Sequence, residues 1–123
     1  AKAGARLRLA PGAVGLVVHQ YTIIGCDVTP CQGVTLGRGD QYLDRAEVPD
    51  DADLGGQIIV GDRVVVGANA VVLFKVGQTL TLGDDSIIGA NSTVLESVPA
   101  GEIWAGSPAR RIRLNPRPPA AQV

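Results

Sequence analysis

Two stretches of the chain decide its fold: VGDRVVVGANAVVL at residues 60–73 and LGDDSIIGANSTVLESVPAG at residues 82–101. Both have an aliphatic residue at every sixth position, often followed by Gly. A period of six fits neither an α-helix, with its period of 3.6, nor an alternating strand, with its period of two. It fits a coil in which three hexads make one triangular turn, with successive turns pairing as parallel strands about 4.8 Å apart. The repeat therefore predicts an all-β, single-stranded parallel β-helix.

The same phase extends toward the N-terminus. The first position of each hexad is expected to point inward and to stack on its equivalents. These residues are Val18, Ile24, Pro30, Leu36, Tyr42, Val48, Leu54, Val60, Val66, Val72 and, after a slip of four, Leu82, Ile88 and Val94. The fifth position is small or β-branched and is also expected inside, where a large side chain would not fit. These residues are Thr22, Val28, Val34, Val64, Ala70, Ser86, Ser92 and Val98.

Glycine recurs at the second position of the hexad. The residues are Gly25, Gly37, Gly55, Gly61, Gly67, Gly83 and Gly89. Glycine there is expected to allow a sharp turn, often with a positive φ. The sequence thus assigns these glycines to the corners of the triangular coil.

Two segments interrupt the repeat and define its parts. Residues 38–56 keep the phase but are rich in Asp and Glu, which favours a protruding loop over an additional coil. The four-residue slip between Phe74 and Thr81 predicts a bulge or small loop. The chain then divides into an N-terminal lead-in (1–14), the β-helix (15–99), a cap with a turn and a short strand (100–114) and a proline-rich, disordered tail (115–123).

Composition narrows the function. The 123 residues suit one domain, and a net charge of −1 gives no general attraction to nucleic acid. No apolar run approaches the ~20 residues that cross a bilayer, and no signal peptide is visible, so a soluble, cytoplasmic protein without a membrane partner is expected. Cys26 and Cys31 are expected to be reduced thiols. A single His beside two Cys makes a zinc site improbable, and no metal is predicted.

Four segments carry a resemblance to a known family. QGVTLG at 32–37, the two stretches that decide the fold, and IWAGSPARRIR at 103–113 resemble serine acetyltransferases and their short relatives of polysaccharide pathways. The resemblance implies a left-handed β-helix, a handedness that the repeat alone does not reveal. It also implies a homotrimer that uses acetyl-CoA as co-substrate and acetylates the hydroxyl of a small molecule, such as serine or a sugar.

The resemblance also implies where coenzyme A binds. The pantetheine would lie along small residues of the two GAN turns, and the adenosine-phosphate end would lie near the C-terminal motif. The residues concerned are Gly67, Ala68, Gly89, Ala90, Gly106, Pro108, Arg110 and Arg111. Asn69 and Asn91 complete the GAN turns and are expected in the left-handed conformation, with or without coenzyme A.

The catalytic histidine is where the chain departs from the family. The family's H-x-x-G base aligns with Gly12, and the protruding loop lacks the family's second histidine. His19 is the chain's one histidine and its candidate catalytic base, with an interface or turn role as the alternative. Two hypotheses follow: an acetyltransferase, or a catalytically degenerate β-helix with a structural or binding role. A zinc-dependent carbonic-anhydrase-like enzyme of this fold would need three histidines.

Overall fold

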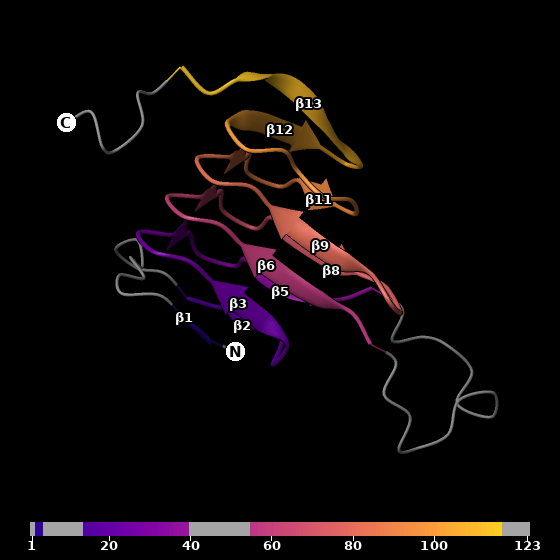
Figure 1. Cartoon of the computed structure of the whole chain (residues 1–123). Helices are drawn as coiled ribbons and strands as arrows, with labels where there is room; N and C mark the ends of the chain where they lie inside the picture. The colour runs from indigo at the N-terminus through magenta and orange to yellow at the C-terminus, as the bar shows by residue number, and fades with distance from the viewer. Residues whose placement is uncertain (1, 4–13, 40–54, 117–123) are drawn as a thin grey trace.

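The computed structural model describes residues 2–3, 14–39 and 55–116, and they form a stack of triangular coils (Figure 1). The coils build three sheets, one for each face of a prism. Face 1 contains β2 (Val17–Val18), β5 (Thr35–Arg38), β8 (Val71–Phe74) and β11 (Thr93–Val94). Face 2 contains β1 (Lys2–Ala3), β3 (Thr22–Ile24), β6 (Gln57–Val60) and β9 (Thr79–Leu82). Face 3 contains β4 (Thr29–Pro30), β7 (Val65–Val66), β10 (Ile87–Ile88), β12 (Glu102–Gly106) and β13 (Ala109–Leu114).

The chain visits the faces in a fixed order, which defines three edges. From face 1 it crosses the 1–2 edge to face 2, then the 2–3 edge to face 3, and then the 3–1 edge back to face 1. All pairs are parallel except the last, in which β13 returns antiparallel along β12. The described residues contain strands and turns and no helix, so the all-β prediction is confirmed.

The register shows how each interruption is accommodated. Val18 pairs with Leu36, so one coil spans 18 residues. Leu36 pairs with Val72, 36 positions later, although β5 and β8 are direct neighbours, as are β3 and β6. No coil therefore lies between them, which excludes 38–56 as an additional coil there; residues 40–54 themselves lie outside the described part. Val72 pairs with Val94 after 22 positions, and the four extra residues form a turn closed by Gln78 N–H donating to the Lys75 carbonyl oxygen at 3.0 Å.

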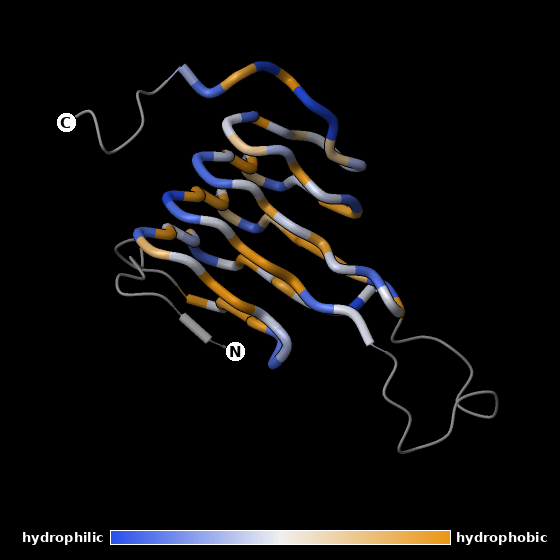
Figure 2. The backbone as a smooth tube through the Cα atoms, in the orientation of Figure 1, coloured by the Kyte–Doolittle hydropathy of each residue, from blue (hydrophilic) through white to orange (hydrophobic). Residues whose placement is uncertain are grey.

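The interior contains the residues that the hexad predicts. Every fifth-position residue is buried, including the hydroxyl-bearing Thr22, Ser86 and Ser92. The first-position residues from Ile24 onward that are described are also buried, whereas Val18 at the open end is partly exposed. Figure 2 shows the resulting pattern, with apolar residues along the strands and hydrophilic turns at the 2–3 edge. The predicted core is therefore confirmed. It is buried because each coil covers its inner face with the coils next to it.

The glycines at the second position have a different role from the expected one. Among them, Gly55 has a positive φ (66°), but Gly25, Gly61, Gly67 and Gly83 do not. The left-handed conformation falls instead on the fourth position of the hexad, at Asp27, Arg63, Asn69, Asp85 and Asn91. A Cβ on Gly67 would lie 2.6 Å from the Ala90 backbone nitrogen of the next coil. Close approach between coils, and not φ, therefore selects glycine at most of these positions.

The two ends of the stack also differ from the expectation. At the N-terminal end β1 pairs in parallel with β3, so the lead-in adds a strand to face 2. At the C-terminal end the expected single short strand is a hairpin of β12 and β13. Trp104 of β12 is buried, with 9% of its surface exposed, and its Nε1–H donates to Glu102 Oε1 at 3.0 Å. The hairpin therefore covers the last coil and shields the end of the core.

Candidate functional site

The small residues predicted to bind coenzyme A gather along the 3–1 edge. Gly67 N–H donates to the Ile88 carbonyl oxygen and Gly89 N–H to that of Trp104, each at 2.8 Å. These bonds stack the two GAN turns on successive coils, with the end of β12 above them. The sequence spacing of 22 residues between the turns is one coil plus the small loop, which is why they align.

The first two residues of each GAN turn have small side chains or none. A Cβ on Gly67 would collide with Ala90 and Gly89, and one on Gly89 would lie 3.0 Å from the Ala105 Cβ. Ala90 is exposed and Ala68 is partly exposed, so methyl groups are the largest side chains at these positions. The arrangement offers an extended ligand a shallow strip of peptide groups, to which it can lie close.

The asparagines of the GAN turns adopt the predicted left-handed conformation. Asn69 has a φ of 61° and Asn91 a φ of 58°. Asn91 N–H donates to the Ala68 carbonyl oxygen at 2.9 Å, which ties one turn to the next. Both asparagines are therefore accounted for by the turn geometry itself.

The C-terminal hairpin places its turn at the upper end of the same edge. Gly106 N–H donates to Ser92 Oγ at 3.2 Å, and the Ser107 hydroxyl lies 3.1 Å from that of Thr93. Pro108 completes this turn after a cis peptide bond. The structure thus brings the hairpin turn and the GAN turns together on one edge, as the resemblance implied.

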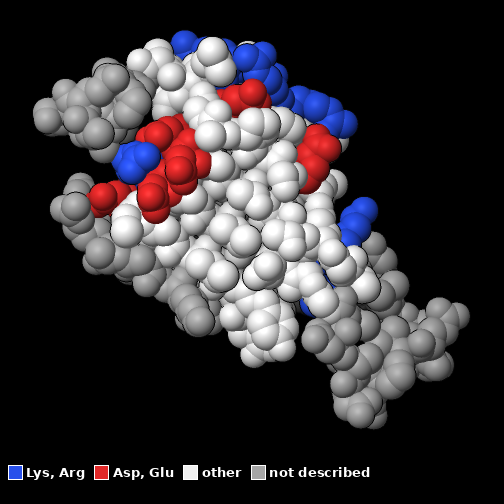
Figure 3. Space-filling view, in the orientation of Figure 1, with Lys and Arg blue, Asp and Glu red and all other residues white. Residues whose placement is uncertain are grey.

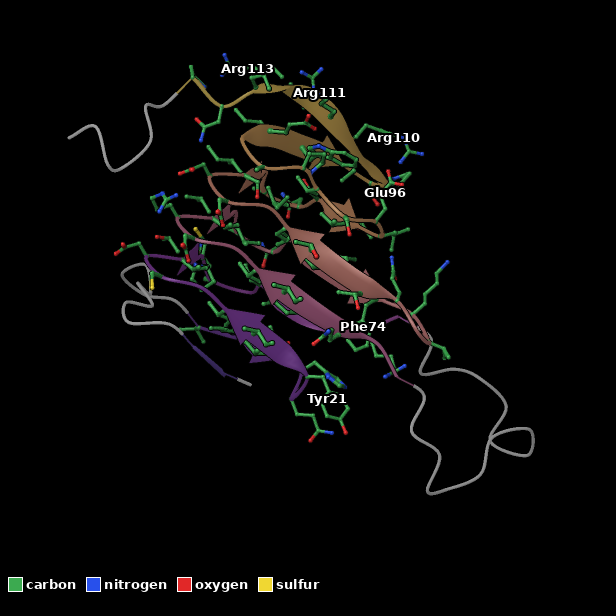
Figure 4. The ribbon with its side chains drawn as sticks, in the orientation of Figure 1. Tyr21, Phe74, Glu96, Arg110, Arg111 and Arg113 are labelled. Atoms are coloured by element: carbon green, nitrogen blue, oxygen red, sulfur yellow. The ribbon has the colours of Figure 1, made fainter. Side chains whose placement is uncertain are left out.

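The two candidate arginines lie on β13, and Figure 4 shows them along the hairpin. Arg110 is exposed near the turn, and its Nη1 donates to the Ala109 carbonyl oxygen at 3.0 Å. Arg111 points back along β12, where its Nε lies 3.3 Å from Glu102 Oε2. Arg110 is therefore the nearer of the two to the hairpin turn, while Arg111 pairs with a carboxylate.

His19 lies at the other end of face 1, just past β2. Its ring is partly buried and packs edge-on against Phe74, with centroids 5.1 Å apart and planes at 80°. The Tyr21 backbone N–H donates to His19 Nδ1 at 3.1 Å. Burial, followed by the positive charge of Arg38, lowers the pKa of His19 from its ordinary 6.5. At neutral pH His19 is therefore uncharged.

Within one chain, the structure does not bring His19 to the coenzyme A candidates. His19 follows the strand of face 1 and lies at the 1–2 edge, whereas Gly67 and Gly89 precede face 1 at the 3–1 edge. The width of face 1 separates them. A site that uses both sets would have to combine residues of two chains.

No sequence motif points to the aromatic and cationic residues around His19. Phe74 is fully buried two coils above, and the Arg38 guanidinium carbon lies 4.7 Å from its ring centroid. Arg38 Nη2 also donates to the Gly55 carbonyl oxygen at 2.6 Å, across the base of the 38–56 segment. The register gives a sequence signal for one pair alone, because Arg38 and Phe74 are 36 positions apart and are partners in β5 and β8.

Charged side chains gather at the 2–3 edge (Figure 3). This edge is separate from the 3–1 edge with the coenzyme A candidates and from the 1–2 edge with His19. Asp62 Oδ1 accepts the Cys26 backbone N–H at 2.8 Å, and Asp84 Oδ1 accepts that of Asp62 at 2.7 Å. Arg63 forms a two-point ion pair with Asp85, its Nε lying 2.8 Å from Oδ1 and its Nη2 3.1 Å from Oδ2. These carboxylates cap turns and link coils, which is a structural role. Cys26 and Cys31 are both free thiols.

Comparison with known proteins is consistent with this architecture. A family model described as the hexapeptide repeat of succinyl-transferase matches residues 57–96 and 79–102. A serine acetyltransferase of Helicobacter pylori is 42% identical in an alignment 81 residues long, which covers 59% of this chain and 47% of the relative. This chain therefore resembles the hexapeptide-repeat part of serine acetyltransferases in sequence. It spans about half the length of the curated relatives that it matches.

Solved structures of serine acetyltransferases have the same fold. The Neisseria gonorrhoeae structure aligns with a TM-score of 0.74 at 28% identity, covering 98% of this chain and 41% of that one. The structure from Brucella abortus in complex with coenzyme A aligns with a TM-score of 0.73 at 33% identity, covering 92% of this chain and 39% of that one. The left-handed winding that the resemblance implied is thereby confirmed. Within the described residues, no helix is long and apolar enough to cross a membrane.

Proposed function

We propose that this hexapeptide-repeat chain is part of an acetyl-CoA-dependent O-acetyltransferase that acts on a small hydroxyl compound, serine being the first candidate. In the reaction the acceptor's hydroxyl oxygen attacks the thioester carbonyl carbon. A C–O bond forms, the C–S bond breaks, and the hydroxyl proton ends on the thiol of coenzyme A. The protein's contribution is to hold the two substrates together and to supply donors for the oxyanion.

The observation that carries the proposal is the strip of small residues along the 3–1 edge. Gly67 and Gly89 stack on one another, Ala90 is exposed beside them, and the hairpin turn at Gly106 closes the upper end. An extended pantetheine can reach the peptide groups there because no large side chain intervenes at these positions. The similarity to the Brucella abortus enzyme, whose structure contains coenzyme A, supports the same ligand for this strip.

Assembly into a homotrimer would complete the site. Figure 3 shows that the exposed surface of face 2 has almost no charged residues, and Ile23 on this face is 43% exposed. A flat, uncharged sheet face is suited to contact with another chain. If the neighbour presented its 3–1 edge to face 2, the contact would bring His19, at the 1–2 edge, toward the strip of that neighbour, which is the arrangement that a single chain lacks.

The test is an acetyl-transfer assay that follows release of the coenzyme A thiol with serine, and with a sugar, as acceptor. Ala90→Phe would place a ring across the 3–1 strip, so it is expected to abolish transfer. Ala100→Phe is the matched control, since Ala100 is also exposed but follows face 2 at the 2–3 edge. Equal activity of the two variants would contradict the proposed position of coenzyme A. No turnover with any small hydroxyl compound would favour the catalytically degenerate β-helix.

A further inference from the structure

The contacts of His19 determine which of its ring nitrogens is protonated. Nδ1 accepts the Tyr21 backbone N–H at 3.1 Å, and an acceptor nitrogen must keep its lone pair. The proton of the neutral imidazole is therefore on Nε2. The ring is also packed edge-on against Phe74 and tilted against Tyr21, with centroids 5.1 and 5.4 Å apart. These contacts oppose the rotation that would exchange the two nitrogens.

The surroundings of His19 also oppose its charged form. A proton on Nδ1 would point at the Tyr21 N–H and break the hydrogen bond. Among the described residues, Arg38 of β5 is the charged group that acts on the ring, and its positive charge disfavours an imidazolium. Phe74 of β8 and Tyr21 of the turn after β2 complete the surroundings with two aromatic rings. Burial and Arg38 lower the pKa of His19, which agrees with the geometry.

We propose that His19 contacts the ligand as a hydrogen-bond donor through Nε2–H and does not act as the general base. The inference rests on the proposed function and changes the role that the sequence assigned to this residue. A general base needs an unprotonated nitrogen that faces the acceptor, and it must become an imidazolium in the reaction. In His19 the unprotonated nitrogen, Nδ1, is taken by the Tyr21 N–H, and burial and Arg38 disfavour the imidazolium. Its Nε2–H, with the guanidinium of Arg38 near the same Phe74 ring, suits an electron-rich oxygen of the ligand.

The tautomer is measured directly by nitrogen-15 NMR of the imidazole. The chain has one histidine, so the ring resonances need no assignment. The expected result is a neutral Nε2–H tautomer at pH 7, with a titration midpoint below 6.5. An Nδ1–H tautomer, or a midpoint above 6.5, would overturn the proposal. The result does not depend on acetyl transfer, so it stands apart from the proposed function.

Variants separate a donor from a base. The amide of Gln donates from nearly the position of Nε2 but cannot take up a proton. His19→Gln is therefore expected to keep kcat within about tenfold, whereas His19→Ala should lose roughly 10²-fold or more, as for a lost oxyanion donor. The acid limb of the pH–kcat profile should be the same in His19→Gln and in the wild type. Equal losses of about 10²–10⁴-fold in both variants would show a base and refute the donor role.

Ligand titrations identify the oxygen that His19 binds. A shift of the Nε2–H resonance with acetyl-CoA but not with coenzyme A would point to the thioester carbonyl, and a shift with serine to an oxygen of the acceptor. Either shift supports the proposal. Calorimetric binding without any shift would overturn this inference alone. Absence of binding would overturn the proposed function together with the ligand contact.

Discussion

Gly67→Ala tests the claim that close packing of the coils, and not backbone conformation, requires glycine at the 3–1 edge. The new Cβ would lie 2.6 Å from the backbone nitrogen of Ala90 and 2.8 Å from the carbonyl carbon of Gly89. Normal carbon contacts are about 3.5–4.0 Å, so the clash is close to 1 Å deep. Both opposing atoms are backbone of the next coil, which Gly67 itself holds through a 2.8 Å hydrogen bond to Ile88. No side chain can rotate away, and the coils must separate. The expected loss is about 1–3 kcal/mol of unfolding free energy, as for other overpacked sites.

Gly37→Ala is the matched control, because Gly37 is at the same position of its hexad. Its Cβ would meet the Thr35 Cγ2 at 3.6 Å, an ordinary contact, and its φ is not positive. This variant is expected to be neutral or to gain about 0.4–1 kcal/mol through the unfolded state. Guanidinium unfolding at equal chain concentration, followed by Trp104 fluorescence and by circular dichroism, measures both variants. Equal stability of Gly67→Ala and Gly37→Ala would refute the packing argument.

Three further perturbations test other parts of the structure. Phe74→Ala removes a fully buried ring and should cost about 3–5 kcal/mol of unfolding free energy, against a smaller loss for the partly exposed neighbour in Leu73→Ala; similar losses by denaturant titration would contradict the placement of Phe74 in the core. Asn69→Ala should cost about 1 kcal/mol because its φ is 61°, and Asn69→Gly should lose less in the same titration; a neutral Ala variant would argue against the left-handed turn. His19 has a lowered pKa, so its contribution to stability is complete above pH 6.5 and is lost as the pH falls through its folded pKa. The melting temperature should therefore fall more between pH 6.5 and 5 in the wild type than in His19→Gln. Parallel curves of melting temperature against pH would contradict the lowered pKa of His19.

The fold could be predicted in detail from the sequence because the hexad is a direct consequence of the geometry. Each coil repeats the same three corners, so residues such as Val60 and Leu82 occupy equivalent inward positions and are both buried. The 38–56 segment was ambiguous for the same reason. Its length of about one coil preserves the phase, and only the direct pairing of β5 with β8 shows that no coil intervenes. Handedness came from resemblance alone, since either hand gives the same period.

The candidate site was less predictable, because contacts between coils depend on register and not on motif. The GAN turns and the C-terminal motif were identified from local sequence, and the structure stacks them on one edge. The surroundings of His19 join β5 and β8 to the turn after β2, positions that no local pattern connects. The expected reason for the second-position glycines was wrong at Gly67 for a similar cause: the restricting atoms belong to the next coil.

Calorimetric titration of the protein with acetyl-CoA, and with coenzyme A, tests the central claim most directly. Saturable binding of both ligands is expected at about one site per chain, retained in Ala100→Phe and lost in Ala90→Phe. No binding at millimolar ligand, or binding that Ala90→Phe leaves unchanged, would contradict a coenzyme A site on the 3–1 edge.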